Sequence, residues 1–250
     1  MTFCWCPPGS FMMGSPEYEQ DHKSDEKQHR VTLTKGFWMG KYEVTQRQWE
    51  SVMGINPSNF KGWFKLSGSH PAESMSWNDC QEFIRKINAS GQVAVSLPTE
   101  AQWEYACRAG TKTPFNFGSV LKGDNANCIG DKPYGTTEKG PNKKETASVG
   151  SYAPNAWGLY DMHGNVCEWC QDMYDPLFYG CATMEDPFCA GAAVNSRVKR
   201  GGGCGSDAKD CRSASRDHSS YGSIYCGLRL VCSTEPRKRE REVFAVSRHY

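Results

Sequence analysis

Residues 200–229 read RGGGCGSDAKDCRSASRDHSSYGSIYCGLR, with Arg-Gly-Gly at one end and Gly-Leu-Arg at the other. Between these ends the composition is dominated by Ser, Gly, Asp, Cys, Tyr and His, with almost no aliphatic side chains. A segment so poor in apolar side chains cannot supply a hydrophobic core by itself. The pattern therefore predicts two fixed ends that enclose a surface loop, and the rest of the chain must provide the framework.

The composition of the whole chain fits a framework built on aromatic rings and turns. Of 250 residues, 38% are hydrophobic and 12% are aromatic, with eight Trp and eleven Tyr, and there are 25 Gly and 13 Pro. This content of Gly and Pro favours many turns over long regular elements. The length is sufficient for one large domain or two small ones. A formal net charge of +1 gives no long-range attraction to nucleic acid or to an anionic membrane.

Hydrophobic runs and cysteine spacing exclude several further classes. No run of about 18 apolar residues occurs, so the sequence predicts no direct insertion into a membrane. The first residues, MTFCWCPPGSF, lack the charged and apolar regions of a signal peptide. The 13 Cys are irregularly spaced, unlike those of a small disulfide scaffold, so we expect mostly buried or free thiols. The single CxxC at Cys167 and Cys170 lacks the partners that a structural zinc site requires.

Three helices are predicted from N-terminal caps and apolar spacing. Thr45 precedes QRQWESVM, Ser76 precedes WNDCQEFIRKINAS, and Thr99 precedes EAQWEYACR, where Gln102 completes a capping box. Gly54 is placed to end the first of these helices. The caps therefore fix where each helix begins.

The remaining segments predict short strands and loops. Alternation in residues 31–45, VTLTKGFWMGKYEVT, predicts two short strands. The charged residues 16–30 predict an exposed loop, and residues 110–157, rich in Gly, Asn, Lys and Pro, predict irregular loops with short strands. The fold class expected from these elements is α+β, with most of the chain irregular.

Seven phrases, in order along the chain, resemble the formylglycine-generating-enzyme (sulfatase-modifying factor) family. They are PPGSFMMGS, KYEVTQRQW, HPAESMSWNDCQEF, LPTEAQWEYACRAG, NAWGLYDMHGNVCEWCQD, RGGGCGSDAKDCRSASR and GLRLV. The resemblance implies a C-type-lectin-like fold over residues 1–232, with a small antiparallel β core, two main helices and many irregular loops. Residues 233–250, STEPRKREREVFAVSRHY, depart from the family and are predicted to be a charged tail or an edge strand.

The resemblance also implies where the chemistry of the enzyme branch would lie. Its oxidising members carry two cysteines, five residues apart, which hold copper. Cys211 matches the second cysteine, but Ser206 stands at the position of the first, and Cys204 lies two residues too early. A serine hydroxyl is not the soft thiolate that Cu(I) prefers. We therefore predict no catalysis, with a formylglycine-generating oxidase or oxygenase that uses Cys211 as the alternative.

A second implied site is a calcium-binding turn in GLYDMHGNVCEW, residues 158–169. Asp161, Gly164, Val166 and Glu168 match the positions of its ligands in the enzymes. Oxygen ligands on a turn suit a hard cation. The alternative is that Asp161 and Glu168 bond to the protein itself without a metal, and both interpretations remain open at this point.

Four arginines lie within residues 200–229, which we call the terminal motif: Arg200, Arg212, Arg216 and Arg229. An enzyme would use them to hold substrate, whereas a framework would bury them as planar groups that tie loops to carboxylates. We expect the framework role for Arg200, Arg212 and Arg229, with Glu100, Glu104 and Glu168 as candidate partners.

The composition of residues 203–226 resembles that of variable proteins diversified by retroelements, such as the Treponema variable protein. In those relatives, mutation of the adenines in Asn codons (AAC) gives NNC codons, which never encode Glu, Gln, Trp, Met or Lys. Only Lys209 falls outside the allowed set in residues 203–226. The pattern also fits antibody-like binding surfaces, in which Tyr supplies contact area and Ser and Gly adapt.

We therefore predict a non-catalytic ligand-binding protein, and expect Ala208, Cys211, Arg212 and Ala214 to face inward. Asp207, Asp210 and Asp217 should favour basic or hydrogen-bond-donating targets. The partner is an unknown protein or surface ligand, and the resemblance implies display at a bacterial cell surface through a lipid anchor. A structural or regulatory lectin-like module with a fixed partner is a third possibility. The predicted contact residues are Cys204, Gly205, Ser206, Asp207, Asp210, Ser215, Asp217, His218, Ser219, Ser220, Tyr221, Ser223, Tyr225 and Cys226.

Overall fold

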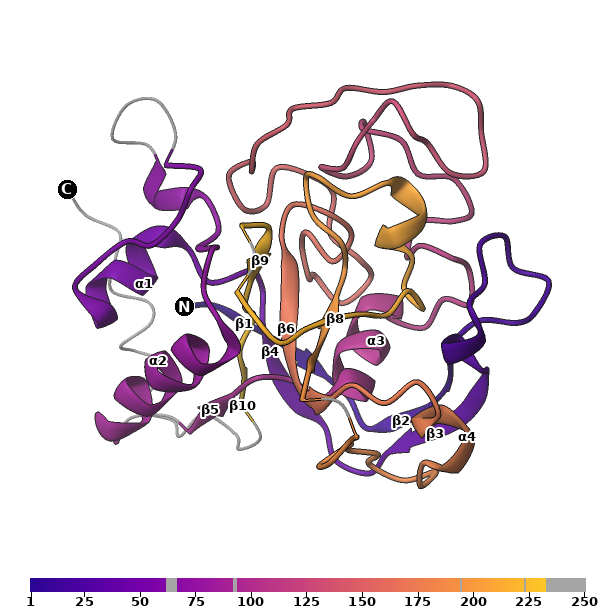
Figure 1. Cartoon of the computed structure of the whole chain (residues 1–250), viewed down its shortest axis with the longest axis horizontal. Helices are drawn as coiled ribbons and strands as arrows, with labels where there is room; N and C mark the ends of the chain where they lie inside the picture. Colours follow the sequence, from indigo (N-terminus) through magenta and orange to yellow (C-terminus); the bar gives the residue numbers. More distant parts are fainter. Residues whose placement is uncertain (62–66, 92–93, 194, 223, 233–250) are drawn as a thin grey trace.

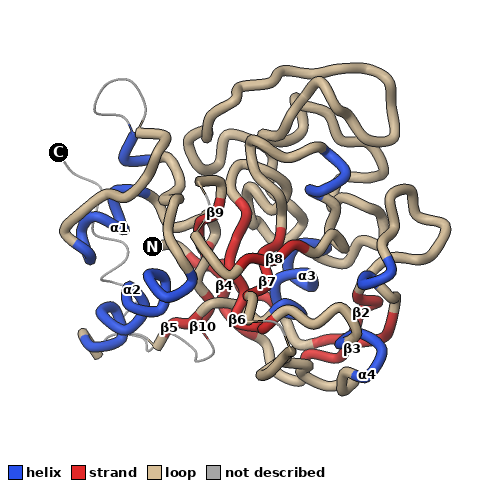
Figure 2. The backbone as a smooth tube through the Cα atoms, viewed as in Figure 1, coloured by secondary structure: helices blue, strands red, loops and turns tan. Residues whose placement is uncertain are grey.

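The computed structural model describes residues 1–61, 67–91, 94–193, 195–222 and 224–232, and it has the expected α+β class (Figure 1). Its helices are α1 Gln46–Met53, α2 Trp77–Ala89, α3 Glu100–Arg108 and α4 Phe178–Cys181, with 3-10 turns η1 Ser24–Glu26, η2 Ser67–Ser69 and η3 Ala208–Cys211. Its strands are β1 Phe3–Cys6, β2 Gly9–Met13, β3 His29–Leu33, β4 Phe37–Gly40, β5 Val95–Ser96, β6 Cys167–Met173, β7 Arg197–Arg200, β8 Asp217–Ser219, β9 Cys226–Gly227 and β10 Val231–Cys232. Loops make up much of the rest (Figure 2).

The helices begin where the sequence places them. The side chains of Thr45, Ser76 and Thr99 each accept a hydrogen bond from the backbone N–H three residues later, and all three form complete capping boxes. Helix α1 ends at Gly54, whose φ of 79° lies in the left-handed region that glycine adopts without strain. These local signals are sufficient because each is satisfied within a few residues.

Short strands form the small β core. One sheet has the order β1-β4-β10-β5, a second pairs β2 with β3, and a third has the order β8-β7-β6-β9. Every strand pair is antiparallel except β6 and β9, which run parallel with Cys167 opposite Cys226. The third sheet carries most of the terminal motif, so it determines where that motif lies.

Aromatic side chains fill the core, as the composition predicts. Trp103 on α3 and Trp169 on β6 are fully buried. Trp49 on α1 stacks on Phe83 of α2, with ring centroids 4.8 Å apart. Helices α1 and α2 lie together beside the β core in Figure 1. Burial of such large rings supplies much of the stabilisation of a chain with few regular elements.

Two loop predictions need correction. Residues 16–30 are not a wholly exposed loop, because Glu26 is fully buried. Residues 110–157 lack the expected short strands and form only single bridges, such as Leu121 opposite Tyr134. A separate apolar cluster that includes Phe115 fixes these loops in place of a strand ladder. Residues 233–250 lie outside the described part of the chain.

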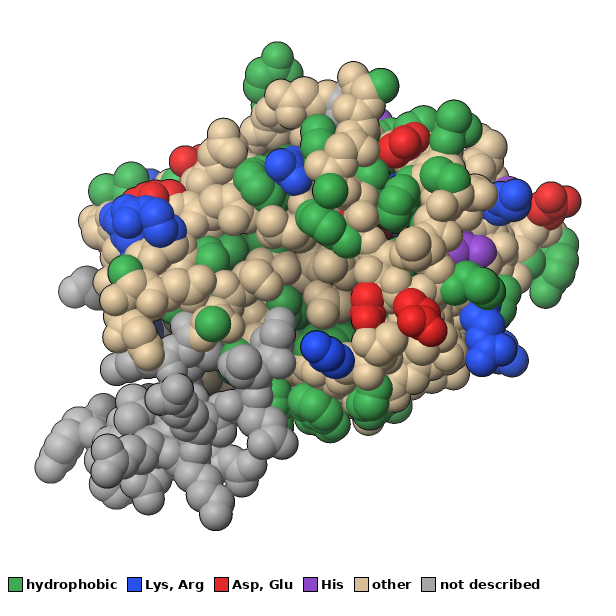
Figure 3. Space-filling view, turned by 90° about the horizontal axis from the view of Figure 1, so that it is seen from below, with side chains coloured by type: hydrophobic (Ala, Val, Ile, Leu, Met, Phe, Trp, Pro, Cys, Tyr) green, Lys and Arg blue, Asp and Glu red, His purple; other side chains and the backbone are tan. Residues whose placement is uncertain are grey.

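All thirteen cysteines are free thiols, and most are buried, as expected. Within the described residues, no helix has the length and apolar character needed to span a bilayer. On the face drawn in Figure 3, acidic and basic side chains are dispersed among polar and apolar ones.

Candidate ligand-binding face

A buried arginine anchors each end of the terminal motif. Arg229 donates to both oxygens of Glu168 at 2.7–3.0 Å and to the Gly40 carbonyl at 2.9 Å. The indole N–H of Trp103 donates to the same carboxylate at 2.7 Å. At the other end, Arg200 contacts Glu104 and the Ser215 carbonyl. Charges buried this deeply are tolerated only when they are fully paired and hydrogen-bonded.

Two further arginines fix the middle of the motif. Arg216 donates to both oxygens of Glu100 at 2.7 and 2.9 Å. Arg212 donates to both oxygens of Glu26 at 2.8 Å. The framework role and the partners Glu100, Glu104 and Glu168 are thus confirmed. Glu26 was missed, because a glutamate inside a charged segment gives no sequence signal that it will be buried.

Between these anchors the motif divides into a buried stretch, residues 211–216, and a mostly exposed stretch, residues 217–222. The four residues predicted to face inward, Ala208, Cys211, Arg212 and Ala214, are all buried. Asp217, His218, Ser220 and Tyr221 are exposed, and Tyr221 retains 80% of its surface. We call the solvent-facing part of residues 205–225 the variable face.

The exposed residues differ in how firmly they are held. His218 stacks on Tyr174 with ring centroids 3.8 Å apart, and its Nδ1 lies 2.9 Å from the Ser196 hydroxyl. The hydroxyl of Ser220 donates to the Asn195 carbonyl at 2.6 Å. Tyr221 is the most open of the predicted aromatic contact residues, and its ring is free to approach a partner.

Three predicted contact residues are corrected by the structure, because Cys204, Ser215 and Cys226 are buried. Cys226 belongs to β9 and pairs with β6. The Cys204 backbone bonds to the Asn165 carbonyl, and the Ser215 carbonyl is the acceptor for an anchoring arginine. Small polar side chains look alike in sequence whether they face solvent or fill gaps next to buried backbone. A fourth, Ser223, lies outside the described residues.

Gly205 and Tyr225 are in direct contact at one border of the variable face. A Cβ on Gly205 would lie 2.8 Å from the phenol ring of Tyr225. Tyr225 is half-buried and also stacks near Phe60, with ring centroids 5.8 Å apart. Gly205 is therefore exposed but sterically constrained, which its residue type alone does not reveal.

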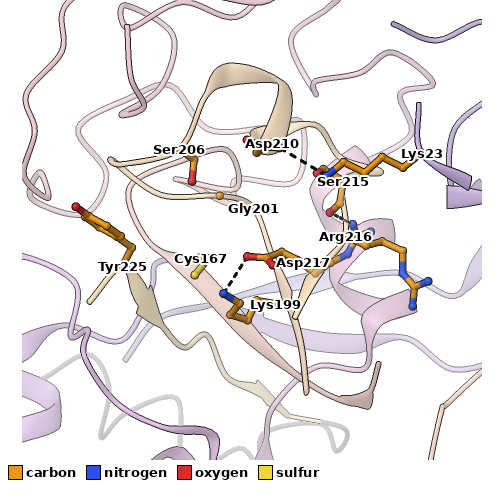
Figure 4. Close-up of a pocket in the computed structure, with 12 residues that line it drawn as sticks. Lys23, Cys167, Lys199, Gly201, Ser206, Asp210, Ser215, Arg216, Asp217 and Tyr225 are labelled. Carbon is orange, nitrogen blue, oxygen red and sulfur yellow. Dashed lines mark hydrogen bonds and ion pairs between the residues drawn. The ribbon is translucent and has the colours of Figure 1, made fainter. Parts of the chain in front are cut away.

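A cavity of about 310 Å³ opens beside the variable face (Figure 4). In it, Lys199 and Asp217 point toward each other, with Nζ and Oδ2 2.9 Å apart. The cavity mixes cations, acids, hydroxyls, a thiol and one phenol ring. Its lining residues are Lys23, Cys167, Lys199, Arg200, Gly201, Gly202, Ser206, Asp210, Ser215, Arg216, Asp217 and Tyr225.

Of the positions implied for copper, Ser206 lines this cavity and Cys211 is fully buried next to Gly202. A Cβ on Gly202 would be 2.6 Å from the Cys211 sulfur and 3.3 Å from the Ser206 Cβ, so these two side chains are close neighbours. The Ser206 hydroxyl accepts from the Gly203 N–H at 3.0 Å. The pKa of Cys211 is raised well above its usual value. The hydrogen bond with the Cys128 thiol is the larger cause, and burial is the second. The same hydrogen bond lowers the pKa of the Cys128 thiol.

The two acids that match the calcium turn already have partners within the protein. Both oxygens of Glu168 are used by Arg229 and Trp103, and an Asp161 oxygen accepts from the Gly150 N–H at 2.6 Å. Burial raises the pKa of Asp161 to about 6. In the part of the chain that the structure describes, no three His, Cys, Asp or Glu side chains gather into a group that could hold a metal. The geometry fits the alternative, in which the two acids bond to the protein itself.

Comparison with known proteins decides the family. Residues 2–234 match the family described as the sulfatase-modifying factor enzyme 1-like domain. The chain belongs to this family. Formylglycine-generating enzyme from Streptomyces coelicolor is 35% identical over 62% of the chain, and the match spans 49% of that relative. Chaperone protein LppX from Paenibacillus barcinonensis is 32% identical over 61% of the chain and 67% of the relative.

Solved structures show that the family fold is kept along the chain. PvdO from Pseudomonas aeruginosa superposes with a TM-score of 0.78 at 26% identity, covering 93% of this chain and 94% of that one. Treponema denticola variable protein 1 superposes with a TM-score of 0.73 at 22% identity, covering 93% and 95%. The predicted fold is therefore confirmed. Proteins of this sulfatase-modifying-factor fold include both enzymes and variable proteins, so membership alone leaves catalysis open.

Proposed function

We propose that this sulfatase-modifying-factor domain is a variable ligand-binding protein that recognises its target through the variable face and performs no oxidation at Cys211. The observation that carries the proposal is the division of the terminal motif into a buried stretch and an exposed stretch. Its arginines are buried and paired, while residues 217, 218, 220 and 221 lie in solvent above them. A rigid support with open side chains is the arrangement that binding loops share. Display at a bacterial cell surface stays a prediction of the family resemblance.

The composition of the segment supports the same proposal. Lys209, its one residue outside the NNC set, is exposed next to the buried Ala208 and lies in η3. If residues 203–226 are a target of mutation, the exposed positions within them can accept new side chains without loss of buried contacts. Mutations at the buried anchors would instead leave a carboxylate unpaired.

An oxidase is the competing function, and one contact favours it. The thiols of Cys128 and Cys211 are hydrogen-bonded neighbours, so Cys128 could supply a second sulfur in place of Ser206. Titration of the reduced protein with Cu(I) against a competing chelator separates the two functions. We expect no stoichiometric copper binding. One tightly bound copper per chain, lost in both C211S and C128S, would overturn the proposal of a non-catalytic protein.

Sequencing the 3′ end of the gene from several isolates tests diversification itself. We expect variation at the exposed positions 217, 220 and 221 and constancy at the four anchoring arginines. Variation spread evenly along residues 1–232, or none in residues 203–226, would contradict the proposal. Invariance across isolates would instead favour a lectin-like module with a fixed partner.

A further inference from the structure

Each aspartate of the variable face is already paired with a lysine from outside residues 203–226. The Nζ–Oδ distances are 3.0 Å for Lys132–Asp207, 3.6 Å for Lys23–Asp210 and 2.9 Å for Lys199–Asp217. The three acidic charges are therefore each matched by a lysine. The expectation that these acids favour basic targets is not supported, because their charges are matched within the protein.

The aspartate and the lysine of each pair differ in how freely diversification can replace them. This step rests on the proposed function, in which NNC codons supply the aspartates. Lysine cannot arise from such codons, and Lys23, Lys132 and Lys199 all lie outside the diversified segment. Diversification would therefore replace the acids and retain the cations. The constant electrostatic feature of the site is positive.

Lys199 is the cation with most to gain from an external anion. Its side chain is only 9% exposed and lines the cavity, whereas its partner Asp217 is 66% exposed. The pair bridges β7 and β8, where the two residues lie directly opposite each other. A nearly buried ammonium that loses its exposed partner is costly unless another anion replaces it. In Figure 4 the open space of the cavity lies next to this pair.

The neighbouring groups suit a carboxylate. Ser206 uses its hydroxyl oxygen as an acceptor for the Gly203 N–H, so its own proton remains available for donation. Lys23 brings a second ammonium to the lining, where Asp210 pairs with it at 3.6 Å, and the Tyr225 ring forms one side. Arg216 contributes no free charge, because Glu100 already neutralises it. A volume of about 310 Å³ lies at the small end of ligand pockets and fits a side chain rather than a large molecule.

We propose that the cavity binds a carboxylate of the target, which pairs with Lys199 in place of Asp217. In the free protein Asp217 is paired with the Lys199 ammonium, and it therefore competes with the ligand for this group. The chemical class of the ligand is therefore a group such as a glutamate side chain or a small free carboxylate. Variants without an acid at position 217 bind this group more tightly.

The experiment uses the whole chain, ¹⁵N-labelled, with two probes that separate the sources of the carboxylate. Sodium acetate represents a free carboxylate, and the capped tripeptide Gly-Glu-Gly represents a side chain, with Gly-Gln-Gly and equimolar sodium chloride as controls. Chemical-shift changes at residues 217–221 report binding. We expect D217N to bind acetate or the Glu peptide about fivefold more tightly than the unmodified protein, since an exposed partner competes only weakly.

Two lysine variants decide whether Lys199 is the anchor. We expect D217N/K199M to lose this binding and D217N/K199R to retain it, while D217N/K23M weakens it less. If K199M unfolds the protein, the comparison of D217N with the unmodified chain decides alone. Equal affinity in those two proteins, or equal responses to the Glu and Gln peptides and to chloride, would overturn the proposal. Carboxylate binding without gene variation would refute only diversification, and variation without carboxylate binding would refute only the anchor.

Discussion

The buried arginines and the variable face belong to one sequence segment, yet they respond to opposite demands. Arg200, Arg212, Arg216 and Arg229 are buried and bound to carboxylates from distant parts of the chain. Ser220 and Tyr221 lie in solvent, and the hydroxyl of Ser220 makes an exposed hydrogen bond to the Asn195 carbonyl. A short segment can therefore combine residues that cannot change with residues that can.

The energetic reason lies in what each side chain loses on substitution. Removal of one partner from a buried ion pair leaves the other charge desolvated and unpaired. Removal of an exposed side chain mostly exchanges contacts with water for other contacts with water. The variable face can thus tolerate substitution only because the buried ion pairs that support it stay unchanged.

The largest effect is expected at Arg229. Arg229→Met leaves Glu168 buried with only Trp103 as a partner, and should lower the free energy of unfolding by about 3–5 kcal/mol. Urea denaturation measures this loss. Arg85→Met is the matched control, since the Arg85–Glu82 pair is exposed, and it should leave the denaturation midpoint unchanged. Similar losses in the two variants would show that burial does not determine how much stability is lost when an ion pair is broken.

A smaller effect of the buried framework is its dependence on pH. Burial, together with the nearby Glu100, raises the pKa of Asp172 to about 7. The folded state then holds a proton that the unfolded state has released, so this group destabilises the fold as pH rises from about 4 to 7. Between pH 5 and pH 7 its contribution should fall by about 2 kcal/mol.

Asp172→Asn isolates this contribution. Burial lowers the pKa of His163 to about 4, and that group acts in the opposite direction over part of the same range. The difference between the unmodified protein and D172N cancels the His163 term. We expect the unfolding free energy of D172N to decrease less between pH 5 and pH 7, and parallel pH profiles would refute the assignment.

Gly205 tests the border between the two regions. Gly205→Ala places a methyl group against the Tyr225 ring and should cost about 1 kcal/mol, the low end of overpacking effects, because the ring is only half-buried. Gly180→Ala, where nothing lies within 4 Å of the added carbon, is the control. Thermal denaturation of both variants gives the comparison. Equal stability would place Gly205 fully within the variable face.

The smallest effect is expected at the open positions. The double variant S220A/Y221A removes a local hydroxyl contact and a side chain that is 80% exposed. The free energy of unfolding should change by less than about 1 kcal/mol in total. Urea denaturation again measures it. A loss comparable to that of Arg229→Met would show that the face supports the fold and is not free to vary.

Much of the framework could be predicted from the sequence because its signals are local. Thr45, Ser76 and Thr99 cap helices through residues only three positions away. The family phrases then gave the arrangement of these elements. The site was predicted less completely, since Cys204, Ser215 and Cys226 share residue types with the exposed positions and differ only in burial.

Sequence alone determined where helices begin, that the charges of the chain nearly balance, and that Ser206 stands where a thiolate would be needed. Tertiary structure alone decided that Glu26 receives Arg212, and that Lys199 meets Asp217 beside a cavity. The physical reason is distance along the chain. A cap is satisfied by its nearest neighbours, whereas the partner of a buried charge can come from any segment that the fold brings to it.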